Sequence, residues 1–288
     1  MHPDTIAVHA GRSIDQATGA VAPPIHLSTT FERDVDGGFS RGFEYSRDDN
    51  PNRLSLETCM AALEGGVAAV AFPSGMAAIA AALEALGIRH HGRLVLPKDM
   101  YFGIRSLLSG TEFGRKLDVV TVDMADLATL ERVCADQKPG IVWIETPSNP
   151  LVSIVDIAGA SAIGRAHGAV IAVDNTWATP LLQRPFELGA DLIVHSLTKY
   201  IGGHSDVMSG AVIVREDGPH LQALRSIQRH KGVLPSPFDC WLALRGAASL
   251  SARMAVHCSS ALAVARFLEQ QTVVTTVHYP GLQSHAGH

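Results

Sequence analysis

The fold of this chain is constrained most by an alternation of short apolar runs with segments of helical character. The runs are rich in β-branched residues, and their alternation with helices is typical of βαβ units and a mostly parallel sheet. The runs are also apolar at almost every position, which indicates strands that are covered on both faces. They lie at residues 67–72, 94–97, 119–122, 141–144, 170–173, 192–194 and 211–214, with helical segments at 54–63, 77–86, 127–134 and 157–167.

The seven runs predict an open α/β fold with a mostly parallel seven-stranded sheet and helices on both faces. A closed eight-stranded barrel is the main alternative, but an eighth βα unit is not evident. Residues 1–52 are rich in Gly, Pro, Ser and Thr, so we expect an extended N-terminal arm that lies on another surface, such as a neighbouring subunit. Residues 53–235 form the predicted large domain. Residues 236–288 predict the start of an incomplete second α+β domain, with one long helix at 238–270 and a strand at 273–279.

Composition excludes several classes of function. The net charge of −5 argues against nucleic acid as the main partner. The apolar runs are too short to span a bilayer, and the N-terminus lacks a secretory signal, so we expect a cytoplasmic protein without membrane partners. The four cysteines are scattered without a CxxC pair, so neither a disulfide framework nor a zinc site is expected. We interpret the adjacent His90 and His91 as solvated loop residues rather than metal ligands.

Two of the apolar runs end in residues that suit pyridoxal 5'-phosphate (PLP). The run at 192–194 is followed by Ser196, Thr198 and Lys199, and the run at 170–173 ends at Asp174. PLP chemistry requires a lysine that forms a Schiff base and an acid that holds the pyridinium nitrogen. A surface lysine and an aspartate that caps the next turn are the ordinary alternatives. Because ligands of open α/β sheets bind beyond the carboxyl ends of the strands, we expect these residues to share one site.

A phosphate subsite is predicted where the first run meets its helix. Ser74, Gly75 and Met76 follow that run and open a helix. Gly75 lets the backbone approach a ligand closely, and free N–H groups at a helix start suit a phosphate. The hydroxyls of Ser196 and Thr198 could bind the same group. A plain strand-to-helix turn with Ser74 as its N-cap is an equal alternative at this stage.

Three further residues could contact such a cofactor. Asn149 stands between two prolines after the run at 141–144, where it could bind a ring oxygen or a substrate carboxylate. Tyr101 follows the run at 94–97 and could stack on a flat ring, although a core tyrosine is the ordinary alternative. Arg47 lies in the predicted arm and is well shaped for phosphate, although loop arginines are usually solvated charges.

The chain carries, in this order, the motifs YSRDDNPNR, PSGMAA, ETPSNP, VDNTWATP, HSLTKYIGGHSD, PFDCWLALRG and HYPGLQSHAGH. Together they resemble the transsulfuration branch of the PLP-dependent enzymes: cystathionine γ-synthase, cystathionine β-lyase, cystathionine γ-lyase and methionine γ-lyase. The resemblance extends from about residue 4 to the end of the chain. It implies a fold-type-I, aspartate-aminotransferase-like enzyme, typically a homotetramer of active dimers, that acts on sulfur amino acids with PLP as cofactor.

The resemblance also implies a role for each matching residue. Lys199 would attach PLP and move protons, and Asp174 would hold the pyridinium nitrogen. One subunit would hold the phosphate, and the adjacent subunit would add Tyr45 and Arg47, with Tyr45 assisting proton transfer. The implied catalytic residues are Lys199, Tyr45 and Tyr101; the implied cofactor-binding residues are Lys199, Asp174, Ser196, Thr198, Gly75, Met76, Tyr101, Tyr45, Arg47 and Asn149.

The family pattern departs from this chain at the C-terminal end, where family members are longer and carry an arginine that binds the substrate carboxylate. We therefore expect a piece of a longer protein rather than a naturally short paralogue. Within the family the reaction stays open, with a slight preference for the γ-synthase or γ-lyase type. The alternatives are a catalytically impaired PLP-binding or scaffolding fragment, and a metal-dependent hydrolase that uses His195, His204 and Asp206.

Overall fold

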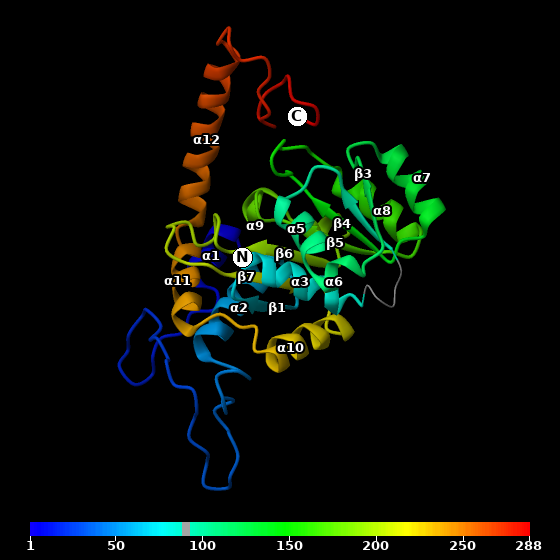
Figure 1. Ribbon diagram of the computed structural model, residues 1–288. Helices are drawn as coiled ribbons and strands as arrows, with labels where there is room; N and C mark the ends of the chain where they lie inside the picture. The colour runs from blue at the N-terminus through cyan, green and yellow to red at the C-terminus, as the bar shows by residue number, and fades with distance from the viewer. Residues whose placement is uncertain (88–92) are drawn as a thin grey trace. The chain divides into compact units, whose positions relative to one another are not determined.

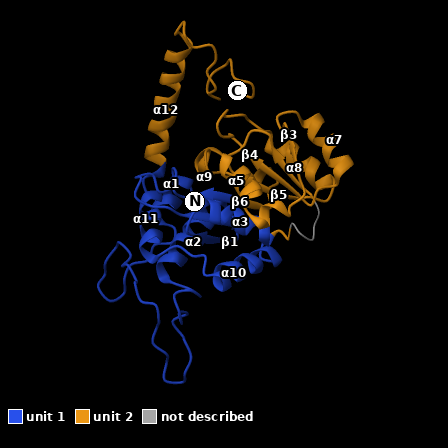
Figure 2. Cartoon of the chain, viewed as in Figure 1, with its two compact units in different colours: residues 1–85, 194–250 blue, residues 86–193, 251–288 orange. Residues whose placement is uncertain are grey.

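The protein is described here by a computed structural model that covers residues 1–87 and 93–288 (Figure 1). His90 and His91, interpreted above as loop residues, lie outside the described residues. The chain divides into two compact units, residues 1–85 with 194–250 and residues 86–193 with 251–288 (Figure 2). Among the described helices, none combines the length and the apolar character needed to cross a bilayer.

Seven strands are hydrogen-bonded in the order β1-β7-β6-β5-β4-β2-β3. The pairs β2–β3, β2–β4 and β4–β5 are parallel, whereas β1 and β7 are antiparallel. The predicted fold class, a mostly parallel seven-stranded α/β sheet, is therefore confirmed. The strands are β1 (Ala68–Phe72), β2 (Leu94–Pro97), β3 (Val119–Val122), β4 (Ile141–Glu145), β5 (Val170–Asp174), β6 (Leu192–Ser196) and β7 (Gly210–Val214).

In the first unit, helices pack on β1 and β7, whose side chains are almost fully buried. Helix α2 shows why the sequence folds this way locally. The Asn50 side chain accepts a hydrogen bond from the backbone of Asn52, Pro51 occupies the first turn, and Gly65 ends the helix in a left-handed conformation. The helices of this unit are α1 (Pro3–His9), α2 (Pro51–Glu64), α3 (Gly75–Ala85), α10 (Pro219–Lys231) and α11 (Pro237–Ala247).

In the second unit, β4 and β5 form a buried pair, and α8, which connects them, packs on both. This is the βαβ unit that the alternating pattern predicts. Trp143 in β4 is fully buried. Within the described residues, the helices of this unit are α5 (Phe102–Gly110), α6 (Glu112–Arg115), α7 (Leu127–Gln137), α8 (Ile157–Ala166), α9 (Thr179–Leu182), the 3₁₀ helix η1 (Pro185–Leu188) and nearly all of α12 (Leu250–Glu269).

Two sequence predictions at the C-terminal end are wrong. The single helix predicted at 238–270 is two helices, α11 and α12, separated at residues 248 and 249. The strand predicted at 273–279 does not form: among the described residues no strand pairs with it, and Val273 is 88% exposed. An apolar run without a partner strand leaves its backbone N–H and C=O groups to water. The predicted division into parts at 1–52, 53–235 and 236–288 stays a prediction.

Candidate active site

In the first unit, the start of α3 lies directly against the end of β6. A Cβ atom added to Gly75 would lie 2.7 Å from Ser196 Cβ and 2.8 Å from its Oγ. Only glycine permits this approach, because real Cβ atoms do not come so close to other heavy atoms. The absence of a side chain therefore brings the first turn of α3 and Ser196 together, as the phosphate prediction requires. Met76 follows Gly75 in that turn.

The turn before α3 is also closely packed. The Ser74 hydroxyl accepts a hydrogen bond from Ala77 N at 3.1 Å, so Ser74 does cap the helix. A Cβ atom on Gly210 of β7 would lie 2.3 Å from Ser74 O. The cap and a phosphate subsite are compatible, because the first N–H groups of an α-helix have no acceptor within the helix.

Lys199 follows β6 in a tight turn. Its N–H donates to Ser196 O at 3.2 Å, its carbonyl accepts from Gly203 N at 2.8 Å, and its side chain is exposed. The neighbouring Thr198 is hydrogen-bonded to Ser209, the residue before β7: its hydroxyl donates to Ser209 O and accepts from Ser209 N, both at 3.1 Å. In this arrangement the Thr198 hydroxyl hydrogen points to Ser209, so a phosphate contact would require the hydroxyl to rotate.

The arm residues Tyr45 and Arg47 are both exposed, and the Arg47 guanidinium lies 5.3 Å from the centre of the Tyr45 ring. The segment that carries them is held by Arg53, a residue for which the sequence pattern predicted no role. Arg53 is 1% exposed and donates to Ser46 O at 2.8 Å and Asp48 O at 2.7 Å. The sequence feature that could have identified Arg53 is its position at the end of the YSRDDNPNR motif.

In the second unit, Asp174 ends β5 beside Glu145, which ends β4; the two are register partners. They are 9% and 5% exposed. Burial, aided by the nearby Asp174 carboxylate, raises the pKa of Glu145 from 4.5 to about 8. Asp174 Oδ1 accepts a hydrogen bond from Thr176 N at 3.0 Å. The strand ends therefore form a buried acidic pair that would suit one cation.

Glu145 also contacts the two loops that carry the remaining predicted residues. Tyr101 N donates to both carboxyl oxygens of Glu145, at 2.9 and 3.0 Å, and Asn149 N donates to Oε1 at 3.0 Å. Tyr101 is half-buried with its ring 4.9 Å from that of Phe102, and Asn149 is exposed. Glu145 begins the ETPSNP motif, but the sequence pattern predicted no role for it.

The residues of the metal-hydrolase alternative lie in different surroundings. His195 is fully buried and is hydrogen-bonded through Nε2 to Glu64, which is also buried. His204 and Asp206 are exposed in the loop before β7, where His204 Nδ1 lies 2.8 Å from Gly202 O. Across residues 1–87 and 93–288, no three His, Cys, Asp or Glu side chains are grouped in a way that could hold a metal ion.

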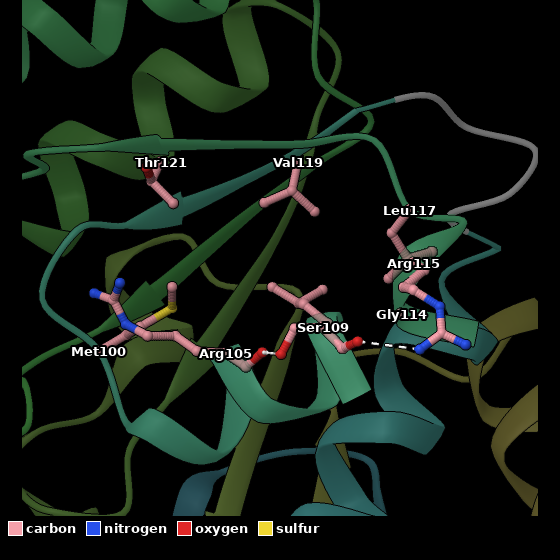
Figure 3. Close-up of a pocket in the computed structure, with 9 residues that line it drawn as sticks. Met100, Arg105, Ser109, Gly114, Arg115, Leu117, Val119 and Thr121 are labelled. Carbon is pink, nitrogen blue, oxygen red and sulfur yellow. Dashed lines mark hydrogen bonds between the residues drawn. The ribbon is translucent and has the colours of Figure 1, made fainter. Parts of the chain in front are cut away.

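An open groove of about 440 Å³ lies elsewhere in the second unit, between α5, α6 and β3 (Figure 3). Arg115 donates to the Ser109 carbonyl at 3.1 Å across one end of it. None of the residues predicted for the cofactor lines this groove. Its lining residues are Met100, Arg105, Leu108, Ser109, Gly114, Arg115, Leu117, Val119 and Thr121.

Known proteins match the chain along almost its whole length. The family described as Cys/Met metabolism PLP-dependent enzyme matches residues 4–288. A cystathionine gamma-synthase of Mycobacterium leprae is 44% identical over 284 residues, which are 99% of this chain and 72% of that protein. A cystathionine beta-lyase of Coxiella burnetii is 40% identical over 288 residues, which are 100% of this chain and 73% of that protein.

The solved structures agree with the sequence relatives. The cystathionine gamma synthase of Xanthomonas oryzae pv. oryzae, in complex with aminoacrylate and cysteine, is 41% identical with a TM-score of 0.92. That match covers 99% of this chain and 73% of the Xanthomonas chain. The resemblance inferred from the motifs is thereby confirmed, and the chain belongs to the Cys/Met metabolism PLP-dependent enzyme family.

Proposed function

We propose that the chain is a PLP-dependent transsulfuration enzyme of the cystathionine γ-synthase type, which acts on sulfur amino acids. The observation that carries the proposal is the family match over residues 4–288. Relatives named cystathionine gamma-synthase, beta-lyase and gamma-lyase all match 99% or more of this chain. No observation favours a catalytically impaired scaffold.

The first unit fits the phosphate of PLP. Gly75 leaves room that a Cβ atom would fill, and this brings the first turn of α3 to Ser196. We propose that Gly75, Met76, Ser196 and Thr198 bind the phosphate oxygens, because backbone N–H groups and hydroxyls donate hydrogen bonds to anions. Lys199 lies on the turn that follows the same strand, and its exposed amine is the group that we propose attaches the cofactor.

The second unit fits the ring of PLP. We propose that Asp174 pairs with the pyridinium nitrogen, because a buried carboxylate is costly without a cation. Tyr101 would stack on the ring, and Asn149 would donate its side-chain amide to the ring oxygen. Bound PLP supplies an electron sink for negative charge that develops at the substrate α-carbon.

The chain's own residues would then move protons and bind the substrate. The Lys199 amine would remove the α-proton of the amino-acid substrate and return it later, with Tyr45 of an adjacent subunit assisting. In γ-replacement, the thiol sulfur would form a bond to Cγ, the bond between Cγ and the leaving group would break, and the thiol proton would be released with the leaving group as its acid. In the eliminations the leaving group would depart without an incoming thiol. The γ-synthase assignment rests on the names of several similar relatives.

The assembly and location are also proposals. Tyr45 and Arg47 are exposed on an arm whose apolar Val21 and Leu27 are 77% and 72% exposed. We propose a homo-oligomer, a dimer of dimers, in which the arm reaches an adjacent subunit to contribute Tyr45 and Arg47. A cytoplasmic location and the division at residues 52 and 235 are retained as predictions from the sequence.

The proposal is tested by trapping the cofactor. The purified protein is incubated with PLP, reduced with borohydride, digested, and analysed by mass spectrometry. We expect a reduced pyridoxyl group on the peptide that contains Lys199, and an unmodified peptide from the Lys199→Ala variant. A pyridoxyl group on another lysine, in wild type and variant alike, would contradict the lysine assignment.

A further inference from the structure

We infer that Glu145 is a positioning residue whose carboxyl group fixes the two loops that carry Tyr101 and Asn149. These loops follow different strands, β2 and β4, and are brought to the same carboxyl group. The inference rests on the proposed function, since Tyr101 and Asn149 are the residues proposed to contact the PLP ring. Glu145 would act through them rather than by touching the cofactor.

The hydrogen bonds carry the first step of the argument. Tyr101 N lies 2.9 and 3.0 Å from the two carboxyl oxygens of Glu145, and Asn149 N lies 3.0 Å from Oε1. Tyr101 immediately precedes α5, so its N–H has no acceptor within that helix. Glu145 therefore supplies the acceptor for a backbone group next to the proposed stacking ring.

The loop after β4 is also held by a second carboxylate, that of Asp99, while the Asn149 backbone is bonded to Glu145. Asp99 Oδ2 accepts from Leu151 N at 3.2 Å and from the Ser153 hydroxyl at 3.3 Å, and it also bonds the Ser148 hydroxyl. Asp99 thus binds the residues on either side of Asn149, whereas the Asn149 N–H donates to Glu145. Loss of the Glu145 carboxyl group would release the backbone at Asn149, the residue proposed to donate a hydrogen bond to the ring oxygen of PLP.

The position of Glu145 beside Asp174 affects how the Glu145 carboxyl group can act as the hydrogen-bond acceptor for the two loops. Glu145 is 5% exposed, and its strand partner Asp174 also ends in a carboxyl group. Two buried carboxylates side by side cannot both ionise cheaply, and burial raises the pKa of Glu145 to about 8. A protonated Glu145 still offers Oε1 as the acceptor for Tyr101 N and Asn149 N.

The test compares Glu145→Gln with Glu112→Gln. An amide retains one acceptor oxygen but turns an N–H₂ group toward the backbone donors, so at least one hydrogen bond is lost. Glu112 is a matched control on α6 of the same unit, where its side chain is 79% exposed and pairs with Lys116. For both variants and wild type, the visible circular dichroism of bound PLP, kcat and KM are measured, together with amide hydrogen exchange at residues 101 and 149.

We expect Glu145→Gln still to attach PLP at Lys199. Its PLP circular dichroism should change, its kcat should fall by about twofold to tenfold, as for loss of a hydrogen bond between neutral groups, and amides 101 and 149 should exchange faster. Glu112→Gln should match wild type throughout. The inference would be overturned if Glu145→Gln had the same PLP circular dichroism, the same kcat and the same amide exchange rates as the wild type.

Hydrogen exchange of the wild type keeps the inference testable if the variant does not fold. Asn149 is exposed, so slow exchange of its amide supports the bond to Glu145, and exchange at the rate of an open loop contradicts it. Failure of the wild type to bind PLP would instead overturn the proposed function, and the exchange result would still decide the role of Glu145.

Discussion

Glu145 and Asp174 lie side by side as register partners at the carboxyl ends of the parallel strands β4 and β5, and both residues are buried. Parallel strands lie about 4.8 Å apart, so two negative charges at this position would repel strongly in a site of low dielectric. The Asp174 carboxylate therefore adds to burial in raising the pKa of Glu145. This relationship leads to a prediction for pH.

The cofactor-free protein should lose stability as pH rises toward about 8. The folded-state pKa of Glu145 is raised from 4.5 to about 8, so its contribution is fully present below pH 4.5 and is lost as pH rises through about 8. A tenfold change in an acid dissociation constant corresponds to roughly 1.4 kcal/mol. Thermal unfolding measured from pH 4.5 to 8 should show a stability that declines in the wild type but not in Glu145→Gln. Parallel plots of stability against pH for the two proteins would refute the raised pKa of Glu145.

Gly75→Ala should destabilise the protein and weaken PLP binding. The new Cβ would lie 2.7 Å from Ser196 Cβ, so the start of α3 or the end of β6 must shift, at about 1–3 kcal/mol. Gly110→Ala is the matched control, because nothing lies within 4 Å of its added Cβ. Urea unfolding should separate the two variants, and equal midpoints would show that the close approach is unimportant.

Arg53→Lys should loosen the arm. Lysine keeps the charge but lacks the planar fork that donates to Ser46 O and Asp48 O, and each of these partly buried carbonyls left unpaired costs up to about 3 kcal/mol. Limited proteolysis should cut the arm faster in this variant. Arg33→Lys, whose wild-type side chain is 62% exposed, should cleave like wild type. Unchanged cleavage of both variants would contradict the anchoring role.

The strands of this fold were predictable because they are continuous apolar runs, and each observed strand matches its run to within two residues. The break between α11 and α12 was not. The Ala-rich sequence on both sides of residues 248 and 249 keeps its helical character, so the local pattern predicts one continuous helix. The run at 273–279 was misassigned because a strand also needs a partner.

The candidate site was predictable in part for a similar reason. Asp174 and Lys199 stand out because polar groups after buried strands mark the ligand-binding edge of an open sheet. Glu145 also follows a buried strand, but its role, like that of Arg53, depends on which backbone groups its side chain reaches. Those partners, Tyr101 and Asn149 for Glu145, become adjacent only in the folded protein.

Asp174→Asn should leave the fold intact but weaken PLP retention. An amide cannot supply the negative charge that pairs with a pyridinium nitrogen, so the dissociation constant for PLP should rise by about tenfold or more, as for loss of a charged hydrogen bond. Asp136→Asn, on the exposed surface of α7, should bind PLP like wild type. Equal affinities and equal turnover in both variants would count against the pyridinium role.

The most direct test of the proposed function is the visible absorption spectrum of the purified protein with PLP, recorded before and after cystathionine is added, with keto acid measured in the same sample. Because γ-replacement needs a thiol, a parallel sample receives cysteine and an amino acid with an ester leaving group at Cγ. A transsulfuration enzyme should show a band of bound PLP that shifts with substrate, with keto acid or cystathionine as product. A band that no sulfur amino acid moves, without either product, would contradict the account.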